Sequence, residues 1–172
     1  EADVPVSENT RELTPEEIHL HRLNRRLEVI ANSVRVEGES VDNFEIVLKP
    51  GRERLAQLGL LREYVRLTTG AVIANDLFVF RGTGTEAINI AKKAIGMHES
   101  VLASSFREAR AAFVHELAHN QYGGHDYDFM HMMQSLFASS EDRLNDVAQK
   151  AFRGEALLDE EKVILDIRGQ WE

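Results

Sequence analysis

The sequence predicts an α+β fold with a small sheet and a helical C-terminal part. Short runs of valine, isoleucine and phenylalanine, bounded by glycine or proline, are typical of strands and lie before residue 98. Beyond residue 98, apolar residues recur at the three- and four-residue spacing of amphipathic helices. The chain has 172 residues, of which 43% are hydrophobic and three are prolines, so it can bury a sizeable core.

We divide the chain into three parts on this basis. Residues 1–13 are polar and lack periodicity, so we expect a flexible tail. Residues 14–97 are expected to form an α/β N-terminal region. Residues 98–172 are expected to form a helical region, which also carries most of the histidines.

The N-terminal region is predicted to begin with a helix that starts at Thr14 and ends near Asn32. Thr14, Pro15 and Glu17 supply the N-cap, the first-turn proline and the capping box that favour a helix start. Glycine and proline then divide the following residues into short elements. We predict strands in VRVEG (34–38) and NFEIVLKP (43–50), a helix at 52–61 ending near Gly59, two short strands within 63–82, and a helix at about 85–95 closed by Gly96.

The helical region is predicted to open at a second capping box, formed by Ser105 and Glu108. This helix should end near the glycine pair at 123–124. Three further helices are predicted at about 127–138, 141–152 and 156–167. Apolar residues at helical spacing are the candidate core of the first two helices: Phe106, Ala109, Phe113 and Leu117, then Phe129, Met133, Leu136 and Phe137.

The composition excludes several classes of site. The formal net charge of −9 argues against a generally nucleic-acid-binding surface and leaves DNA contact uncertain. The chain has no cysteine, which excludes disulfides and cysteine-based zinc sites and fits a reducing compartment. No signal peptide and no run of 18 apolar residues is present, so we expect no membrane contact and a cytoplasmic or nuclear location.

A histidine cluster at residues 111–133 holds four of the seven histidines of the chain. His115 and His119 are four residues apart, which places them one turn apart on one face of a helix and lets both imidazoles bind a single Zn²⁺. Glu116 lies between them. In HExxH sites this glutamate does not bind the metal but takes a proton from the attacking water.

A third ligand is predicted at His125, six residues beyond His119 and after a glycine pair that can turn the chain off the helix. Asp126 or a distant carboxylate is the alternative. His131 is expected to be exposed or to lie behind the ligands. Tyr122 and Tyr127 could donate a hydrogen bond to a developing oxyanion, although packing or surface roles fit them equally well.

From His115 the sequence reads HELAHNQYGGHDYDF, and Leu136 follows. This pattern resembles the signature of the WLM-domain zinc metallopeptidases, which are related to the SprT/Spartan proteases that degrade proteins crosslinked to DNA. The resemblance covers about residues 104–140. It implies a zincin-like fold with an HExxH active-site helix, zinc ligands at His115, His119 and His125, and Glu116 as general base.

The sequence departs from this family in one strand. WLM domains carry an arginine-rich strand of the kind IRLRLR before the metal-binding helix, and the corresponding strand in related zincins helps to position substrate. LFVFRG at residues 77–82 is the nearest candidate here. It contains a single arginine, Arg81, so it is not an arginine-rich strand and the mode of substrate binding stays open.

Three functions follow as hypotheses. The first is a zinc metalloendopeptidase that acts on a protein or peptide substrate, such as a DNA-crosslinked or ubiquitin/SUMO-conjugated protein. The second is a module that binds ubiquitin-pathway partners or an AAA segregase through a zinc-stabilised, protease-like fold. Residues 47–61, VLKPGRERLAQLGLL, resemble the C-terminal pattern of PUB domains, which bind segregase tails, but they also fit an ordinary α/β segment. The third is a small zincin of unrelated specificity.

Overall fold

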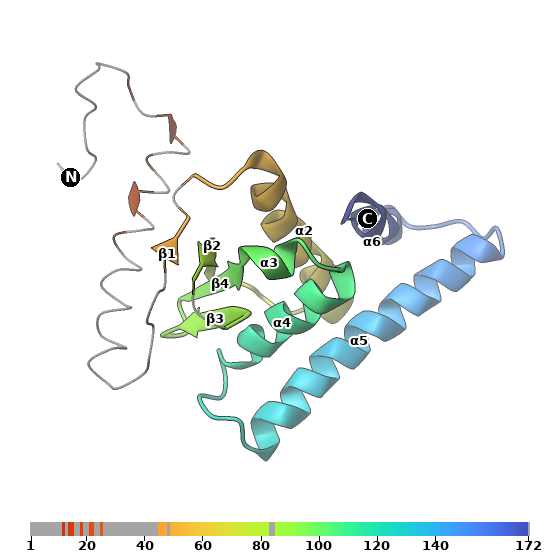
Figure 1. The fold of residues 1–172 in the computed structure, drawn as a ribbon. Coiled ribbons are helices and arrows are strands. Elements are labelled where there is room, and N and C mark those ends of the chain that lie inside the picture. Colours follow the sequence, from red (N-terminus) through yellow and green to blue (C-terminus); the bar gives the residue numbers. More distant parts are fainter. Residues whose placement is uncertain are drawn as a thin grey trace.

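The computed structural model describes residues 45–47, 49–82 and 85–171 and a few single positions between 12 and 25. This part of the chain is an α+β fold in which helices pack against one small mixed sheet (Figure 1). The predicted tail, most of the helix predicted after Thr14 and the VRVEG strand lie outside the described residues. In the described part, no helix combines the length and the apolar character needed to cross a membrane.

The sheet has the strand order β1-β2-β4-β3. The central strands β2 and β4 run parallel, and each outer strand is antiparallel to its neighbour. Strand β3 is therefore an edge strand of the described sheet. The strands are β1 (Glu45–Ile46), β2 (Asp76–Arg81), β3 (Ala87–Ile90) and β4 (Ala94–His98).

The helices build one hydrophobic core with the sheet. Helix α4 contacts β3 and β4 on one side and α5 on another, and α2 contacts α5 and α6 (Figure 1). All four residues predicted as the apolar stripe of the metal-binding helix are buried in this core. The helices are α2 (Arg52–Thr69), α3 (Glu99–Leu102), α4 (Phe106–Ala118), α5 (Tyr127–Phe152) and α6 (Asp159–Trp171).

Helix α2 corrects the prediction that a helix ends near Gly59, and it takes the place of the first of the two strands predicted within 63–82; the second is present as β2. The helix continues to Thr69 and ends at Gly70, whose φ of 75° is left-handed. Residues at helical spacing carry the packing beyond Gly59, because Leu58, Leu61 and Val65 face the same core. A glycine inside a helix costs about 1 kcal/mol, and tertiary burial of this face outweighs that cost.

The helix predicted at 85–95 is also wrong, because this segment forms the β3–β4 hairpin. Ala91 and Lys92 have φ values of 52° and 60°, and the N–H of Lys93 donates to the carbonyl of Ile90 at 2.9 Å. Two consecutive left-handed residues make a tight turn between Ile90 and Lys93, and three residues lie between the paired Ile90 and Ala94. Alanine and lysine are uncommon in that conformation, so the sequence carried no turn signal.

Helix α5 corrects the prediction of two helices at 127–138 and 141–152. A serine pair at 139–140 favours a helix boundary in isolation. The structure instead continues the helix, because Leu144 and Val147 extend the buried face and no glycine or proline interrupts it. The last helix ends at Trp171 rather than near residue 167, since the Trp171 indole packs against Phe106 and donates to the Ser104 carbonyl at 3.3 Å.

Arg110 fixes α4 against its neighbours. Its side chain is 2% exposed and lies within 5.6 Å of the Tyr64 ring and 4.7 Å of the Phe137 ring. The guanidinium also donates to the Tyr64 hydroxyl at 3.2 Å and forms an ion pair with Glu141. A buried cation requires such partners, so the contacts of Arg110 stabilise the position of α4 between α2 and α5.

Gly96 and Gly59 provide a matched pair of glycine-to-alanine substitutions with opposite expected signs. A Cβ at Gly96 would lie 2.3 Å from the Phe78 ring, whereas a Cβ at Gly59 meets nothing within 4 Å. Gly96→Ala should lower the free energy of unfolding by about 1–3 kcal/mol through overpacking. Gly59→Ala should raise it by about 0.5–1 kcal/mol. Urea unfolding measures both, and equal stability of the two variants would contradict the packing described.

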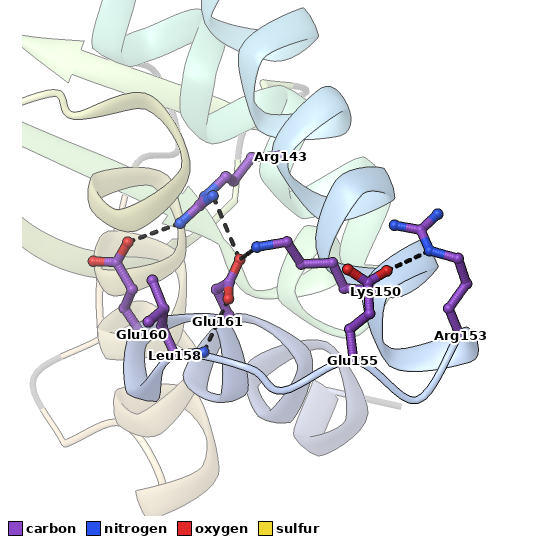
Figure 2. A network of polar contacts seen from close by, with 7 residues as sticks. All are labelled: Arg143, Lys150, Arg153, Glu155, Leu158, Glu160 and Glu161. Atoms are coloured by element: carbon purple, nitrogen blue, oxygen red, sulfur yellow. Dashed lines mark hydrogen bonds and ion pairs between the residues drawn. The ribbon is translucent and has the colours of Figure 1, made fainter.

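A polar network joins α5 to α6, as Figure 2 shows. The carboxylate of Glu161 is 1% exposed, accepts from the backbone N–H of Leu158 at 2.9 Å and pairs with Lys150 at 3.0 Å. Arg143 lies 3.7 Å from the same carboxylate and 2.7 Å from Glu160. The N–H of Leu158, followed by Lys150, lowers the pKa of Glu161 below its usual range.

Glu161 should therefore make the stability of the fold depend on pH. Because its pKa is lower in the folded chain than in the unfolded chain, its contribution is present at neutral pH and is lost as the pH falls through the folded-state pKa. Glu161→Gln should lower the melting temperature at pH 7, and the difference from the native chain should shrink below about pH 4. Glu160→Gln, at an exposed ion pair, is the control and should have a smaller effect. A pH-independent difference for Glu161→Gln would contradict this account.

Candidate metal centre

Helix α4 and the turn after it position two of the candidate ligands. The Ser105 side chain caps the helix by accepting from the N–H of Glu108, as the capping box predicts. His115 lies in the last turn, and His119 is the C-cap residue, where its N–H donates to the Glu116 carbonyl at 3.1 Å. The chain thus leaves the helix at His119, before the glycine pair, and neither glycine of the pair has a positive φ.

The third imidazole is brought back by a short loop. Asp126 accepts from the backbone N–H of Phe129 at 3.0 Å and so caps α5, which fixes the residue directly after His125. His115, His119 and His125 lie close enough to bind one metal ion, since their ligand atoms are all within 4.8 Å of one another. The carboxylate of Asp126, the alternative ligand, is used as a helix cap instead.

The distances within this histidine trio suit a tetrahedral ion. Two nitrogens at ordinary Zn–N distances in a tetrahedral site are about 3.3 Å apart. The Nε2 atoms of His115 and His125 are 3.2 Å apart. Burial, reinforced by the two neighbouring imidazoles, lowers the pKa of His115, which favours the neutral form that a metal requires. Three nitrogen donors without a cysteine or carboxylate are a donor set that zinc accepts.

The imidazoles are held in orientation by their surroundings. Nδ1 of His119 lies 3.0 Å from the carbonyl of Tyr122, which leaves its Nε2 for a metal. Phe129, fully buried, stacks on the His119 ring at 4.4 Å and meets the rings of His115 and His125 at 5.0 and 4.9 Å. This ring forms an apolar support for all three imidazoles.

The other residues named from the sequence have separate places. The ring of His131 stacks on Tyr127 with centroids 6.1 Å apart, on the exposed surface of α5 and outside the trio. Tyr122 contacts His119 through its carbonyl oxygen rather than through its hydroxyl.

Glu116 is the buried carboxyl of the site. Its residue is 8% exposed, and its Oε2 lies 3.9 Å from Nε2 of His115. Burial raises the pKa of Glu116 to about 7, while a hydrogen bond from the backbone N–H of Asn89 acts in the opposite direction. A carboxyl with this pKa can accept and release a proton near neutral pH.

A cavity of about 630 Å³ begins at His115 and Glu116 and extends along α4 to Glu108. Its opposite wall includes Ala87 of β3 and Ser100 of α3. Residues 108, 112, 115 and 116 share one face of α4, so the cavity follows the helix for about 12 Å. Small side chains along both walls leave this space unfilled.

The position of β3 was missed from the sequence because its residues were assigned to a helix. LFVFRG, the candidate for a substrate strand, corresponds to β2, which lies between β1 and β4 inside the sheet. The edge strand beside α4 is β3. Asn89 on this strand contacts Glu116, and only the alternation of AINI could have indicated a strand there.

Comparisons of the chain with protein-family models, with curated proteins and with solved structures gave no match. Inference about function therefore rests on the geometry of the site and on the motif that begins at His115.

The trio should bind one divalent zinc ion per chain. Replacing one imidazole by a methyl group removes a ligand, so His119→Ala and His125→Ala should each weaken zinc binding by more than the roughly 10- to 100-fold typical of residues that only orient a ligand. His131→Ala is the control and should bind as the native chain does. Competition with a chromophoric chelator measures the dissociation constants. If His125→Ala bound zinc as tightly as the native chain does, His125 would not be a zinc ligand.

Proposed function

We propose that this chain is a zinc-dependent metalloendopeptidase of the WLM/SprT-like type, with a zincin-like arrangement of helix and sheet. One observation carries the proposal: three imidazoles that can hold a metal lie beside a buried carboxyl at the end of an open cavity. A structural metal site is closed by four protein ligands, whereas three ligands leave a position for water or substrate. The spacing from His115 to Phe129 supports the same function by its resemblance to the WLM signature.

Zinc bound at the trio would polarise a substrate carbonyl and acidify a water molecule. The residues of this chain do the rest. The imidazoles of His115, His119 and His125 would hold the ion, and the Tyr122 carbonyl keeps His119 in one tautomer. Phe129 keeps bulk water away from the back of the rings.

Glu116 is proposed to act as the general base. Its carboxylate would accept a proton from the water that attacks the peptide carbonyl and then deliver it to the departing amine nitrogen. Burial favours proton uptake by this group, and the positive charge of a bound ion would lower its pKa again. The two effects act on the pKa of Glu116 in opposite directions.

Strand β3 is proposed to hold the peptide. The N–H of His98 donates to the carbonyl of Glu86, so in this antiparallel pair alternate residues bond to β4. Ala87 and Asn89 fall between those residues and direct their backbone groups away from β4. The N–H of Asn89 bonds to the Glu116 carboxyl, so the proposed peptide would pair with the backbone groups of Ala87. An extended peptide can pair with such an edge, and Ala87 also lines the cavity that reaches Glu116. This edge would replace the arginine-rich strand that the sequence lacks.

The substrate class follows from the resemblance and stays part of the proposal: a DNA-crosslinked protein or a ubiquitin/SUMO conjugate. The segment 47–61 is proposed to belong to the protease domain rather than to a separate segregase-binding PUB domain. Leu58 and Leu61 support this, because they pack in the same core as Phe113 and Leu117 of the metal-binding helix.

Glu116→Gln tests the catalytic proposal. The amide cannot accept the proton, so cleavage should fall by at least about 100-fold, while zinc content stays at one ion per chain. Glu53→Gln makes the same chemical change at an exposed position of α2 outside the cavity and should keep full activity. The assay uses three substrates: a DNA-crosslinked protein, a ubiquitin fusion and casein.

The outcomes separate the hypotheses. Preference for the crosslinked protein or the ubiquitin fusion supports the WLM/SprT-like type, and cleavage of casein alone indicates a zincin of unrelated specificity. If the native chain and Glu116→Gln were equally inert with zinc bound, the peptidase proposal would be wrong and a binding module would be favoured.

A further inference from the structure

Three asparagines from separate segments meet beside the metal-binding turn. Asn75 precedes β2, Asn89 lies on β3, and Asn120 follows His119 directly. The side-chain amides of Asn75 and Asn120 bond to each other in both directions, at 2.9 and 2.7 Å. The amide of Asn89 donates to the same Asn120 oxygen at 2.8 Å. We call these three side chains the carboxamide cluster.

Any substitution of Asn120 would remove at least one of its side-chain hydrogen bonds. Its oxygen accepts two bonds and its nitrogen donates a third, which uses both halves of the amide. Aspartate offers the acceptor but not the donor, and alanine offers neither. Asn75 is 4% exposed, so the loss of Asn120 would leave a buried amide without its partner.

Asn89 connects the cluster to the general base. Its side-chain nitrogen donates to the backbone carbonyl of Glu116 at 2.7 Å, and its backbone N–H bonds to the Glu116 carboxyl. The same Glu116 carbonyl accepts the backbone N–H of His119. One strand residue thus contacts the last turn of α4 at the point where the turn presents both Glu116 and His119.

The cluster also braces the strained hairpin. The Asn89 oxygen accepts from the N–H of Lys92 at 2.9 Å, and the Asn75 amide lies 3.4 Å from the Lys92 carbonyl. Lys92 and Ala91 are the two residues with left-handed φ values. Bonds from both asparagines hold this turn, and therefore the whole β3 edge, in one position relative to α4.

We propose that the carboxamide cluster holds the His119–Asn120 turn and strand β3 in a fixed position relative to each other. It thereby sets the geometry of the metal site and of the adjoining cavity. The inference rests on the proposed function for its kinetic consequence. Its metal-binding consequence follows from the placement of His119 alone. Asn75, Asn89 and Asn120 are positioning residues, because they act through His119 and Glu116.

The test compares the native 172-residue chain with Asn120→Ala, using zinc affinity and the visible spectrum of bound Co²⁺. Zinc has a filled d shell and is silent, whereas the cobalt bands report ligand geometry. Asn120→Ala should bind zinc about 10-fold more weakly, as expected when an orienting residue is lost, and should shift the cobalt bands. With a peptide substrate, kcat should fall more than KM rises, because the ligands and base are displaced rather than the substrate pocket.

Two controls keep the result interpretable. Gly96→Ala destabilises the sheet by clashing with Phe78 on the face of the sheet opposite to Asn89, and should leave zinc affinity and the cobalt spectrum unchanged. Asn89→Ala, at a partly exposed position, serves as the second variant if Asn120→Ala does not fold. The double variant should lose little more affinity than Asn120→Ala alone, because its two sites share one network.

Native affinity and an unchanged cobalt spectrum in Asn120→Ala would overturn the inference. So would an equal loss in Gly96→Ala, which would reveal general destabilisation, or additive losses in the double variant. A native chain that binds zinc but cleaves nothing would count against the proposed function and leave the affinity comparison intact.

Discussion

The rotation of helix α4 about its own axis is the constraint on which the site depends. Phe113 and Leu117 of this helix pack into the core, while His115 and Glu116 lie along the cavity. A change of one residue in register would turn the helix by about 100° and move both pairs of side chains out of these positions. Arg110 prevents that change, because its buried guanidinium has partners on α2 and α5 in a single orientation.

With α4 fixed in this rotation, burial shifts the pKa values of its two functional groups in opposite directions. Burial raises the pKa of Glu116 and lowers that of His115, so both groups tend towards their neutral forms. Neutral imidazoles are ready for a cation, and a cation would restore the charge on the carboxylate. Phe129 packs against the imidazole rings, while the backbone N–H of Asn89 partly offsets the effect of burial on the Glu116 pKa.

The metal trio could be predicted from the sequence because its geometry is local. Four-residue spacing on a helix fixes His115 against His119, and the α5 cap at Asp126 returns the chain within a few residues. The edge strand could not be predicted in this way. Its hairpin turn uses Ala91 and Lys92 in a conformation that local preference disfavours. A long-range bond from Asn75 to the Lys92 carbonyl supports this conformation, together with a local bond from the Lys92 N–H to Asn89. The continuity of α2 and α5 was missed for the same reason, since burial overrides a glycine or a serine pair.

The motif can determine only the features that residues close together in the sequence form. All three candidate ligands and the base come from eleven consecutive residues, 115–125, so a short pattern can specify metal binding. The cavity walls come from β3, α3, α4 and α5, and no short pattern contains them. Two chains could therefore share the motif and bind the same ion while accepting different peptides. Under the proposed function, substrate choice would depend on the walls that Glu86, Glu108 and Met133 help to form, because side chains there can differ in size and charge without replacing a ligand.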